Sequence, residues 1–209
     1  AELELINEWA YASEVIFHGT PSGIDNSVST FGGMLTFTKG DGMKPLERSA
    51  AAAPLRVLVT NTKVPRSTSA LVGGVRVLHD ALPGVTVPLF DAIEAVVLRS
   101  VALLRDGDAQ QHLPTLMAMN QALLQAVGVS HPALNAVCAA MAGAGLPGTK
   151  LTGAGGGGCA ITLLGDDAGA ARARAPCAAL EAVHGCECFE TTLGGDGVLL
   201  VDGTIASSL

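Results

Sequence analysis

The chain has 209 residues, which is enough for one large domain or for parts of two. Hydrophobic residues make up 49% of it and charged residues 15%, so a sizeable core can be buried. A net charge of −7 with scattered Lys and Arg argues against nucleic-acid binding, which needs a basic face. No uncharged apolar run reaches the roughly 18 residues of a membrane span. The five cysteines match no zinc or disulfide framework, which favours reduced thiols in a cytoplasmic protein.

The chain opens inside a helical pattern. Leu3, Ile6, Ala10 and Glu14 fall at helical spacing, which predicts a helix to about residue 14. No initiating Met and no N-cap signal precede it, so we expect a longer protein of which this chain is the second part. A short helix is expected to open near Pro21.

The remaining elements change character along the chain. Strands are expected at residues 34–38 and 55–60, and Ala/Leu-rich helices at 67–82, 87–105, 112–127 and 131–144. A strand at 159–164, a helix at 168–183 and strands at 187–192 and 198–202 follow, the last two joined by a turn at residues 194–197. Strands followed by a run of helices predict an α+β fold, with a boundary near residues 45–55.

The most unusual segment is the glycine run Lys150–Cys159, in which five of the ten residues are glycine. It matches G-x-G-x-x-G formally, but a β-leaning apolar run follows it instead of a helix, which argues against a dinucleotide fold. No Gly-Lys-Ser/Thr follows either, which excludes a P-loop. Two readings stay open: a tight strand-to-strand turn, or an anion-binding concavity of backbone N–H groups helped by Thr152 and Lys150.

A second polar segment spans residues 18–26. Ser22 and Asp25 have the spacing that opens a helix, so Asp25 either complements the helix dipole or accepts a proton from an attacking hydroxyl. Glu14 is either a solvated helix residue or a second carboxylate for Mg²⁺. His18 could contact a small polar substrate.

Residues 60–68 leave the predicted strand and open a helix with Ser67 or Thr68 as the N-cap. Within this segment Arg66 could clamp a substrate carboxylate. The other histidines show no metal spacing and are expected to be structural or exposed: His79, His112, His131 and His184.

Three segments together resemble the GHMP superfamily of small-molecule kinases: residues 18–30, 60–66 and 150–159. The resemblance implies a GHMP kinase-like fold, with residues 1–54 as the end of the N-terminal domain and residues 55–209 as a helix-rich C-terminal domain with an antiparallel sheet. It also implies ATP and Mg²⁺ as cofactors. Residues 18–26 and 60–66 point to mevalonate as the phosphoryl acceptor, and a homodimer is expected.

The resemblance also implies roles for single residues. Asp25 matches the catalytic aspartate, Glu14 the glutamate that helps to hold Mg²⁺, and His18 and Thr68 the substrate pocket. Thr20 stands where many relatives are expected to carry Asn. The expected nucleotide-binding residues are those of the glycine run: Thr152, Gly153, Ala154, Gly155, Gly156 and Gly157.

Two features of the superfamily have no match here: an active-site lysine near the start and a serine-bearing phosphate loop. We therefore expect the 209 residues alone to lack kinase activity. Alternative functions are another kinase of the superfamily, acting on phosphomevalonate, homoserine or galactose, and a non-catalytic domain that retains the fold.

Overall fold

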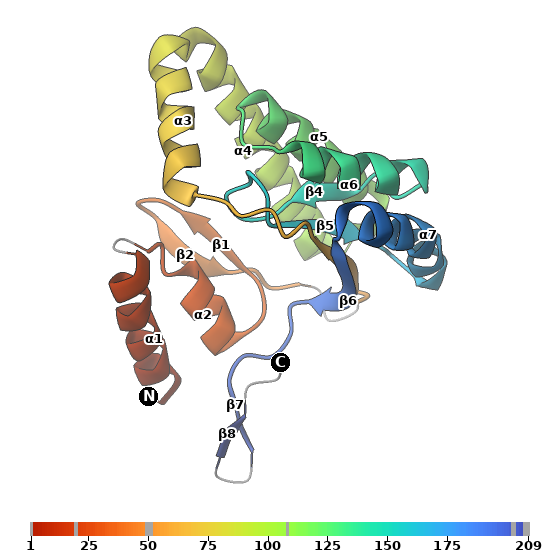
Figure 1. Ribbon diagram of the computed structural model, residues 1–209. Coiled ribbons are helices and arrows are strands. Elements are labelled where there is room, and N and C mark those ends of the chain that lie inside the picture. The colour runs from red at the N-terminus through yellow and green to blue at the C-terminus, as the bar shows by residue number, and fades with distance from the viewer. Residues whose placement is uncertain (1, 19–20, 49–51, 108, 202–203, 207–209) are drawn as a thin grey trace. The chain divides into compact units, whose positions relative to one another are not determined.

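The structure is a computed structural model that describes residues 2–18, 21–48, 52–107, 109–201 and 204–206 (Figure 1). The chain divides into two compact units, one formed by Ala1–Glu47 with Leu193–Leu209 and the other by Arg48–Thr192. Helices and antiparallel strands occur in both units, which confirms the predicted α+β class. The division into family domains at residues 54 and 55 remains a prediction.

The first unit joins two helices to two small hairpins. Its elements are α1 (Glu2–His18), α2 (Ile24–Phe31), β1 (Leu35–Thr38), β2 (Gly42–Pro45), β7 (Leu199–Val201) and β8 (Thr204–Ala206). β1 pairs with β2, and β7 with β8, both antiparallel. Helix α1 continues one turn beyond the predicted end at residue 14.

One stripe of α1 is partly covered, and the other residues between Glu2 and Ile16 are exposed. The covered residues lie at helical spacing: Ile6, Asn7, Ala10 and Glu14. Asn7 Oδ1 accepts a hydrogen bond of 2.7 Å from Nδ2 of Asn26, which is a buried residue of α2. The stripe that carries Glu14 is therefore the face of α1 that packs against α2.

The predicted strands at 187–192 and 198–202 are confirmed as β6 (Glu187–Leu193) and β7 (Leu199–Val201), but they belong to different sheets. The turn segment instead lies along the end of α2, where Gly33 donates to Gly195 O at 2.8 Å and Val198 donates to Thr30 O at 3.0 Å. The second strand then pairs with β8. The turn residues 194–197 are compatible both with a hairpin between the two strands and with the observed path along α2. The backbone hydrogen bonds that the end of α2 offers decide between these two paths.

The second unit is built on a sheet with strand order β4-β5-β3-β6. Its elements are β3 (Leu55–Asn61), α3 (Thr68–Ala81), α4 (Pro83–Asp106), α5 (Ala109–Ala126), α6 (Pro132–Gly143), β4 (Thr149–Leu151), β5 (Cys159–Leu163), α7 (Asp167–His184) and β6 (Glu187–Leu193). β5 pairs antiparallel with both β3 and β4. The predicted helices are confirmed with ends shifted by a few residues, whereas β4 was not predicted.

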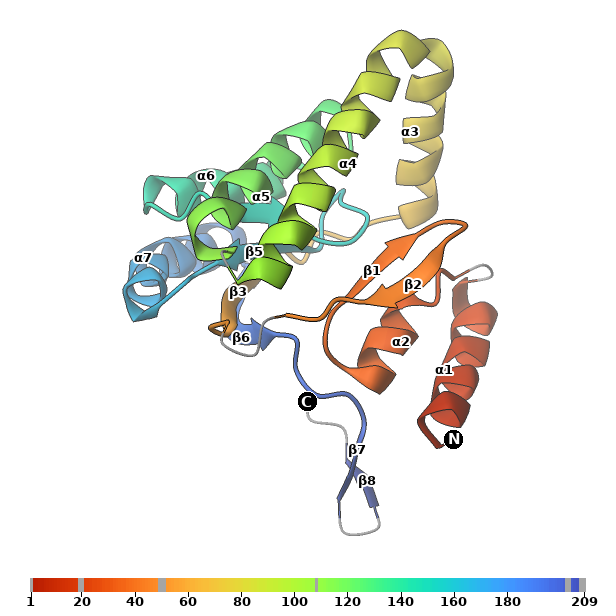
Figure 2. The same ribbon diagram turned by 180° about the vertical axis from the view of Figure 1, so that it is seen from behind.

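The core of this unit lies between the sheet and α6. Leu134, Val137 and Met141 recur at helical spacing on α6 and are fully buried against Leu58, Leu151 and other core residues. Burial of each such side chain stabilises the fold by about 1.5–3 kcal/mol. Helices α4 and α5 lie side by side in both views (Figures 1 and 2).

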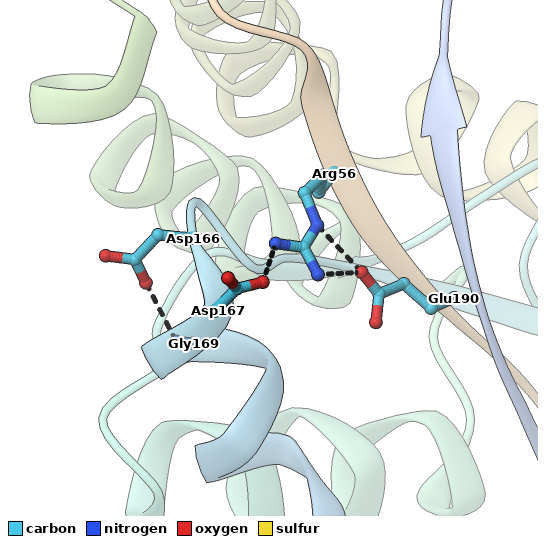
Figure 3. A network of polar contacts seen from close by, with 5 residues as sticks. All are labelled: Arg56, Asp166, Asp167, Gly169 and Glu190. Atoms are coloured by element: carbon cyan, nitrogen blue, oxygen red, sulfur yellow. Dashed lines mark hydrogen bonds and ion pairs between the residues drawn. The ribbon is translucent and has the colours of Figure 1, made fainter.

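A charged network ties three elements of this unit together (Figure 3). Arg56 of β3 donates through Nε to Glu190 of β6 at 2.8 Å and forms an ion pair of 2.5 Å with Asp167 of α7. These carboxylates raise the pKa of Arg56. The adjacent Asp166 caps α7, because its side chain accepts from Gly169 N–H at 2.9 Å.

Across the described residues, no helix has the length and apolar character needed to cross a membrane.

Candidate active site

The glycine run forms the connection between the antiparallel strands β4 and β5. Thr152 N–H donates to Cys159 O at 3.0 Å and closes the loop. The five glycines from Gly153 to Gly158 all have positive φ. The predicted strand-to-strand turn is thus confirmed. A turn of this kind can also bind an anion, so the two predicted roles of the loop are compatible.

The segment that follows β3 is folded onto this loop. Thr62 donates to Gly158 O through its backbone N–H at 2.9 Å and through its hydroxyl at 2.7 Å. Gly158 N–H donates to Val64 O at 3.1 Å. Two of the three segments that carried the family resemblance are therefore in direct contact.

Several glycines in the loop have neighbours that approach too closely for a side chain. For example, a Cβ at Gly155 would collide with Val129 O, and one at Gly158 would collide with the guanidinium of Arg66. Both residues also have positive φ, 84° and 68°, where side chains are strained. Glycine is required at these positions because neighbouring groups approach the backbone closely.

Arg66 places a positive charge on the loop. Its Nη1 donates to Gly157 O at 3.4 Å, and its Nη2 lies 3.3 Å from where a Cβ of Gly153 would be. The predicted contact with a substrate carboxylate remains a prediction. The observed position puts the guanidinium beside the backbone N–H groups of the loop.

Helix α3 begins next to the same loop. Ser67 is its N-cap, as predicted, and its Oγ accepts from Ala70 N–H at 3.3 Å. Thr68 is the first helical residue and is exposed. Leu71 packs against Gly156, with Cδ1 only 2.8 Å from the position of a Cβ. The positive end of the helix dipole therefore also lies near the loop.

Several N–H groups of the loop are available for a ligand. Gly156 donates to Val129 O at 2.8 Å and Gly158 to Val64 O. Within the part of the chain that the structure describes, Gly153, Ala154, Gly155 and Gly157 donate to no backbone carbonyl. Successive N–H groups of this kind form an anion-binding concavity. Together with Arg66 they fit a nucleotide phosphate.

Lys150 does not extend this cluster of donors. Its Nζ donates to Leu151 O at 2.7 Å, and burial lowers the pKa of the side chain. Its predicted role as a nearby positive charge remains a prediction.

The candidate base lies in the other unit. Asp25 is exposed in the first turn of α2. The expected N-cap Ser22 is wrong: Gly23, with φ 78°, is the N-cap and makes no side-chain cap bond. Ser22 Oγ instead accepts from Ile24 N–H at 3.4 Å. Asp25 is therefore not part of a capping box, and its place in the first turn is compatible with both predicted roles, as a partner of the helix dipole and as a base.

Glu14 and His18 come from α1. Glu14 lies on the stripe that faces α2, and His18 is the last residue of the helix. The described residues contain no group of three or more His, Cys, Asp or Glu that could hold a metal. Mg²⁺ takes few protein ligands and keeps water and phosphate oxygens, so the predicted role of Glu14 as a magnesium ligand needs no such group and remains a prediction. Thr20 lies outside the described residues.

The predicted site residues are divided between the two units. Thr68 and the glycine run belong to the unit Arg48–Thr192, and Glu14, His18 and Asp25 belong to the other unit. Their joint role as a site remains a prediction. The sequence did not predict two residues that hydrogen-bond to the glycine run or to the strand before it, Val129 and Gln121. A signal existed for Gln121, because it follows Leu113 and Met117 at four-residue spacing on the buried face of α5.

Comparison with known proteins defines the class. Residues 92–182 match the family model described as GHMP kinases C terminal. The fold also resembles a galactokinase of Lactococcus lactis complexed with galactose, at 21% identity and a TM-score of 0.59, over 94% of this chain and 60% of that one. Residues 92–182 thus match the C-terminal domain of the GHMP kinases.

The most similar relatives narrow the assignment. The mevalonate kinase of Homo sapiens is 43% identical over 99% of this chain and 52% of its own length, and that of Arabidopsis thaliana is 39% identical over 93% and 51%. The structure of L. major mevalonate kinase in complex with R-mevalonate superposes with a TM-score of 0.80 at 27% identity, over 91% of this chain and 59% of that one. The chain spans about half the length of the curated relatives it matches.

Proposed function

We propose that the protein containing this chain transfers the γ-phosphoryl group of ATP to the primary hydroxyl of mevalonate, giving 5-phosphomevalonate and ADP. The observation that carries the proposal is the glycine run, in which N–H groups with no backbone acceptor among the described residues lie near Arg66 and the start of α3. These groups are suited to bind nucleotide phosphates. We infer mevalonate as the phosphoryl acceptor from the names of the similar proteins, which are mevalonate kinases.

Asp25 accepts the proton of the attacking hydroxyl. An exposed carboxylate outside a capping box can reach a bound alcohol, and a positioned base contributes typically 10²–10⁴-fold to a rate. Glu14 helps to hold Mg²⁺, which supplies charge neutralisation for the phosphates when bound. His18 and Thr68 contact mevalonate. Most of the catalysis then comes from positioning and fixed charge.

The cellular setting is part of the same proposal. We place the protein in the cytoplasm because its described cysteines are free thiols, which suit a reducing compartment. We also propose a homodimer. An apolar cavity of about 530 Å³ between α4 and α5, lined by Val96, Leu116 and Met119 among others, offers a surface for self-association.

A substrate panel tests the proposal. The full open reading frame that contains these residues is expressed and supplied with MgATP and, separately, mevalonate, phosphomevalonate, homoserine or galactose. Phosphorylation of mevalonate is expected. Turnover of another acceptor without turnover of mevalonate would assign the protein to a different kinase of the family, and absence of turnover with all four would favour a non-catalytic role.

A further inference from the structure

Gln121 of α5 lies under the start of the glycine run. Its side chain is only 6% exposed, and both ends of its amide are hydrogen-bonded. Oε1 accepts from Leu151 N–H at 2.8 Å, and Nε2 donates to Ser130 Oγ at 3.1 Å. The Oγ–H of Ser130 in turn donates a hydrogen bond to Asn135 Oδ1 at 2.7 Å. The network joins α5, β4 and the start of α6.

The donors and acceptors in this network fix the orientation of Gln121. A backbone N–H can only donate, so the amide oxygen must face Leu151 and the nitrogen must face Ser130. β4 is at the edge of the sheet, and Leu151 pairs with β5 on one side. Gln121 therefore satisfies an edge-strand donor two residues before Gly153, at a buried position where an unpaired N–H is costly.

A second contact ties the same network to the far side of the loop. Val129, which precedes Ser130, accepts from Gly156 N–H at 2.8 Å. Val129 O also approaches Gly155 so closely that a Cβ does not fit there. The segment 129–130 is thus held by Gln121 and in turn holds the glycine run.

We propose that Gln121 is a positioning residue for nucleotide phosphate. It fixes Leu151 directly and Gly156 through Ser130 and Val129, so it positions both ends of the segment Gly153–Gly155. In the part of the chain that the structure describes, the N–H groups of this segment donate to no backbone carbonyl. Donors fixed before the ligand arrives bind charge without the cost of reorganisation. The inference rests on the proposed role of the glycine run as a phosphate site.

The test compares Gln121→Met with Gln125→Met in the full-length protein. Met matches the length of Gln and removes both hydrogen bonds, whereas Gln125 is an exposed residue of the same helix. In Gln121→Met we expect faster amide hydrogen exchange at residues 152–158, with β3 unchanged. We also expect the KM for ATP to rise about tenfold, the size of a hydrogen-bond loss, with the KM for mevalonate unchanged. Gln125→Met should match the wild type.

Ser130→Ala provides a milder variant if Gln121→Met does not fold, and it should raise exchange at residues 152–158 to a smaller extent. Wild-type exchange at these residues in both variants would overturn the inference. So would faster exchange with an unchanged KM for ATP, because the loop would then be held by Gln121 without serving the nucleotide. If the wild-type protein phosphorylates none of the four acceptors, the proposed function fails, and titration with ATP alone decides the inference: equal ATP affinity in wild type and Gln121→Met overturns it.

Discussion

The guanidinium of Arg66 lies against the backbone of Gly158, so closely that no side chain fits at that glycine. Arg66 also donates to Gly157 O at 3.4 Å. The two residues are 92 positions apart in the sequence, and Thr62 and Val64 join their segments by backbone hydrogen bonds to Gly158. The contact makes a fixed positive charge part of the loop.

Gly158→Ala should disturb the loop far more than Gly185→Ala. Both glycines have similar positive φ, 68° and 65°, but nothing lies within 4 Å of a Cβ at Gly185. Backbone strain of about 1–2 kcal/mol is therefore common to both variants, and only Gly158→Ala must also displace Arg66. We expect the free energy of unfolding to fall further in Gly158→Ala, measured by urea denaturation of the full-length protein. An equal decrease in the free energy of unfolding in both variants would show that Arg66 moves away from Gly158 without a free-energy cost.

Arg66→Gln should weaken nucleotide use. The change removes the charge while leaving a donor, and hydrogen bonds that involve a charged group are worth about 1.5–3 kcal/mol. We expect kcat/KM for ATP to fall roughly 10- to 100-fold. Arg99→Gln, at an exposed position of α4, is the control and should have no effect. Normal ATP kinetics with impaired use of mevalonate would instead assign Arg66 to the substrate carboxylate.

Cys177 should be unreactive in the folded protein. Burial, with a hydrogen bond to Cys188, raises the pKa of the Cys177 thiol to about 12. An ordinary thiol has a pKa of about 8.5, so near pH 8 the thiolate fraction is lower by roughly 10³. Alkylation of Cys177 by iodoacetamide, followed by mass spectrometry, should be slower by about that factor than in the same protein in urea. Comparable rates in both conditions would contradict the burial of this thiol.

Lys150→Met should alter how stability depends on pH. Burial lowers the pKa of Lys150 in the folded protein below the roughly 10.4 of an unfolded chain. Between those two values the unfolded state binds more protons, so the free energy of unfolding of the wild type rises with pH. Lys150→Met lacks this contribution. Urea unfolding from pH 7 to pH 10.5 should show the wild type gaining relative to the variant, whereas a constant difference would mean that the charge of Lys150 is not penalised.

Local sequence patterns predicted the helices well because helical spacing is read within a single segment. The spacing of Ile6, Ala10 and Glu14 predicted helix α1, and these three residues lie on its partly covered stripe. The N-cap of α3 was narrowed to Ser67 or Thr68 from their side chains and their place before a helix, and the structure shows Ser67 in that position.

The features that the sequence did not predict depend on distant partners. β4 is three residues long and is a strand because it pairs with β5. The turn before β7 takes its conformation from hydrogen bonds with α2, and Gly23 replaces Ser22 as the cap of α2. In the candidate site, the glycine run was recognisable locally, whereas its contact with Arg66 joins segments that are far apart in the chain.

The central claim is that Asp25 is the base of a mevalonate kinase, and the most direct measurement compares the full-length wild-type protein with Asp25→Asn under saturating MgATP and mevalonate. The wild type should form ADP and 5-phosphomevalonate in equal amounts. Asp25 is exposed, so Asp25→Asn should fold normally and lower kcat by about 10²–10⁴-fold. Asp41→Asn, an exposed carboxylate in the turn between β1 and β2, should keep wild-type kcat. A wild type that does not phosphorylate mevalonate, or an Asp25→Asn variant with near-normal kcat, would contradict the claim.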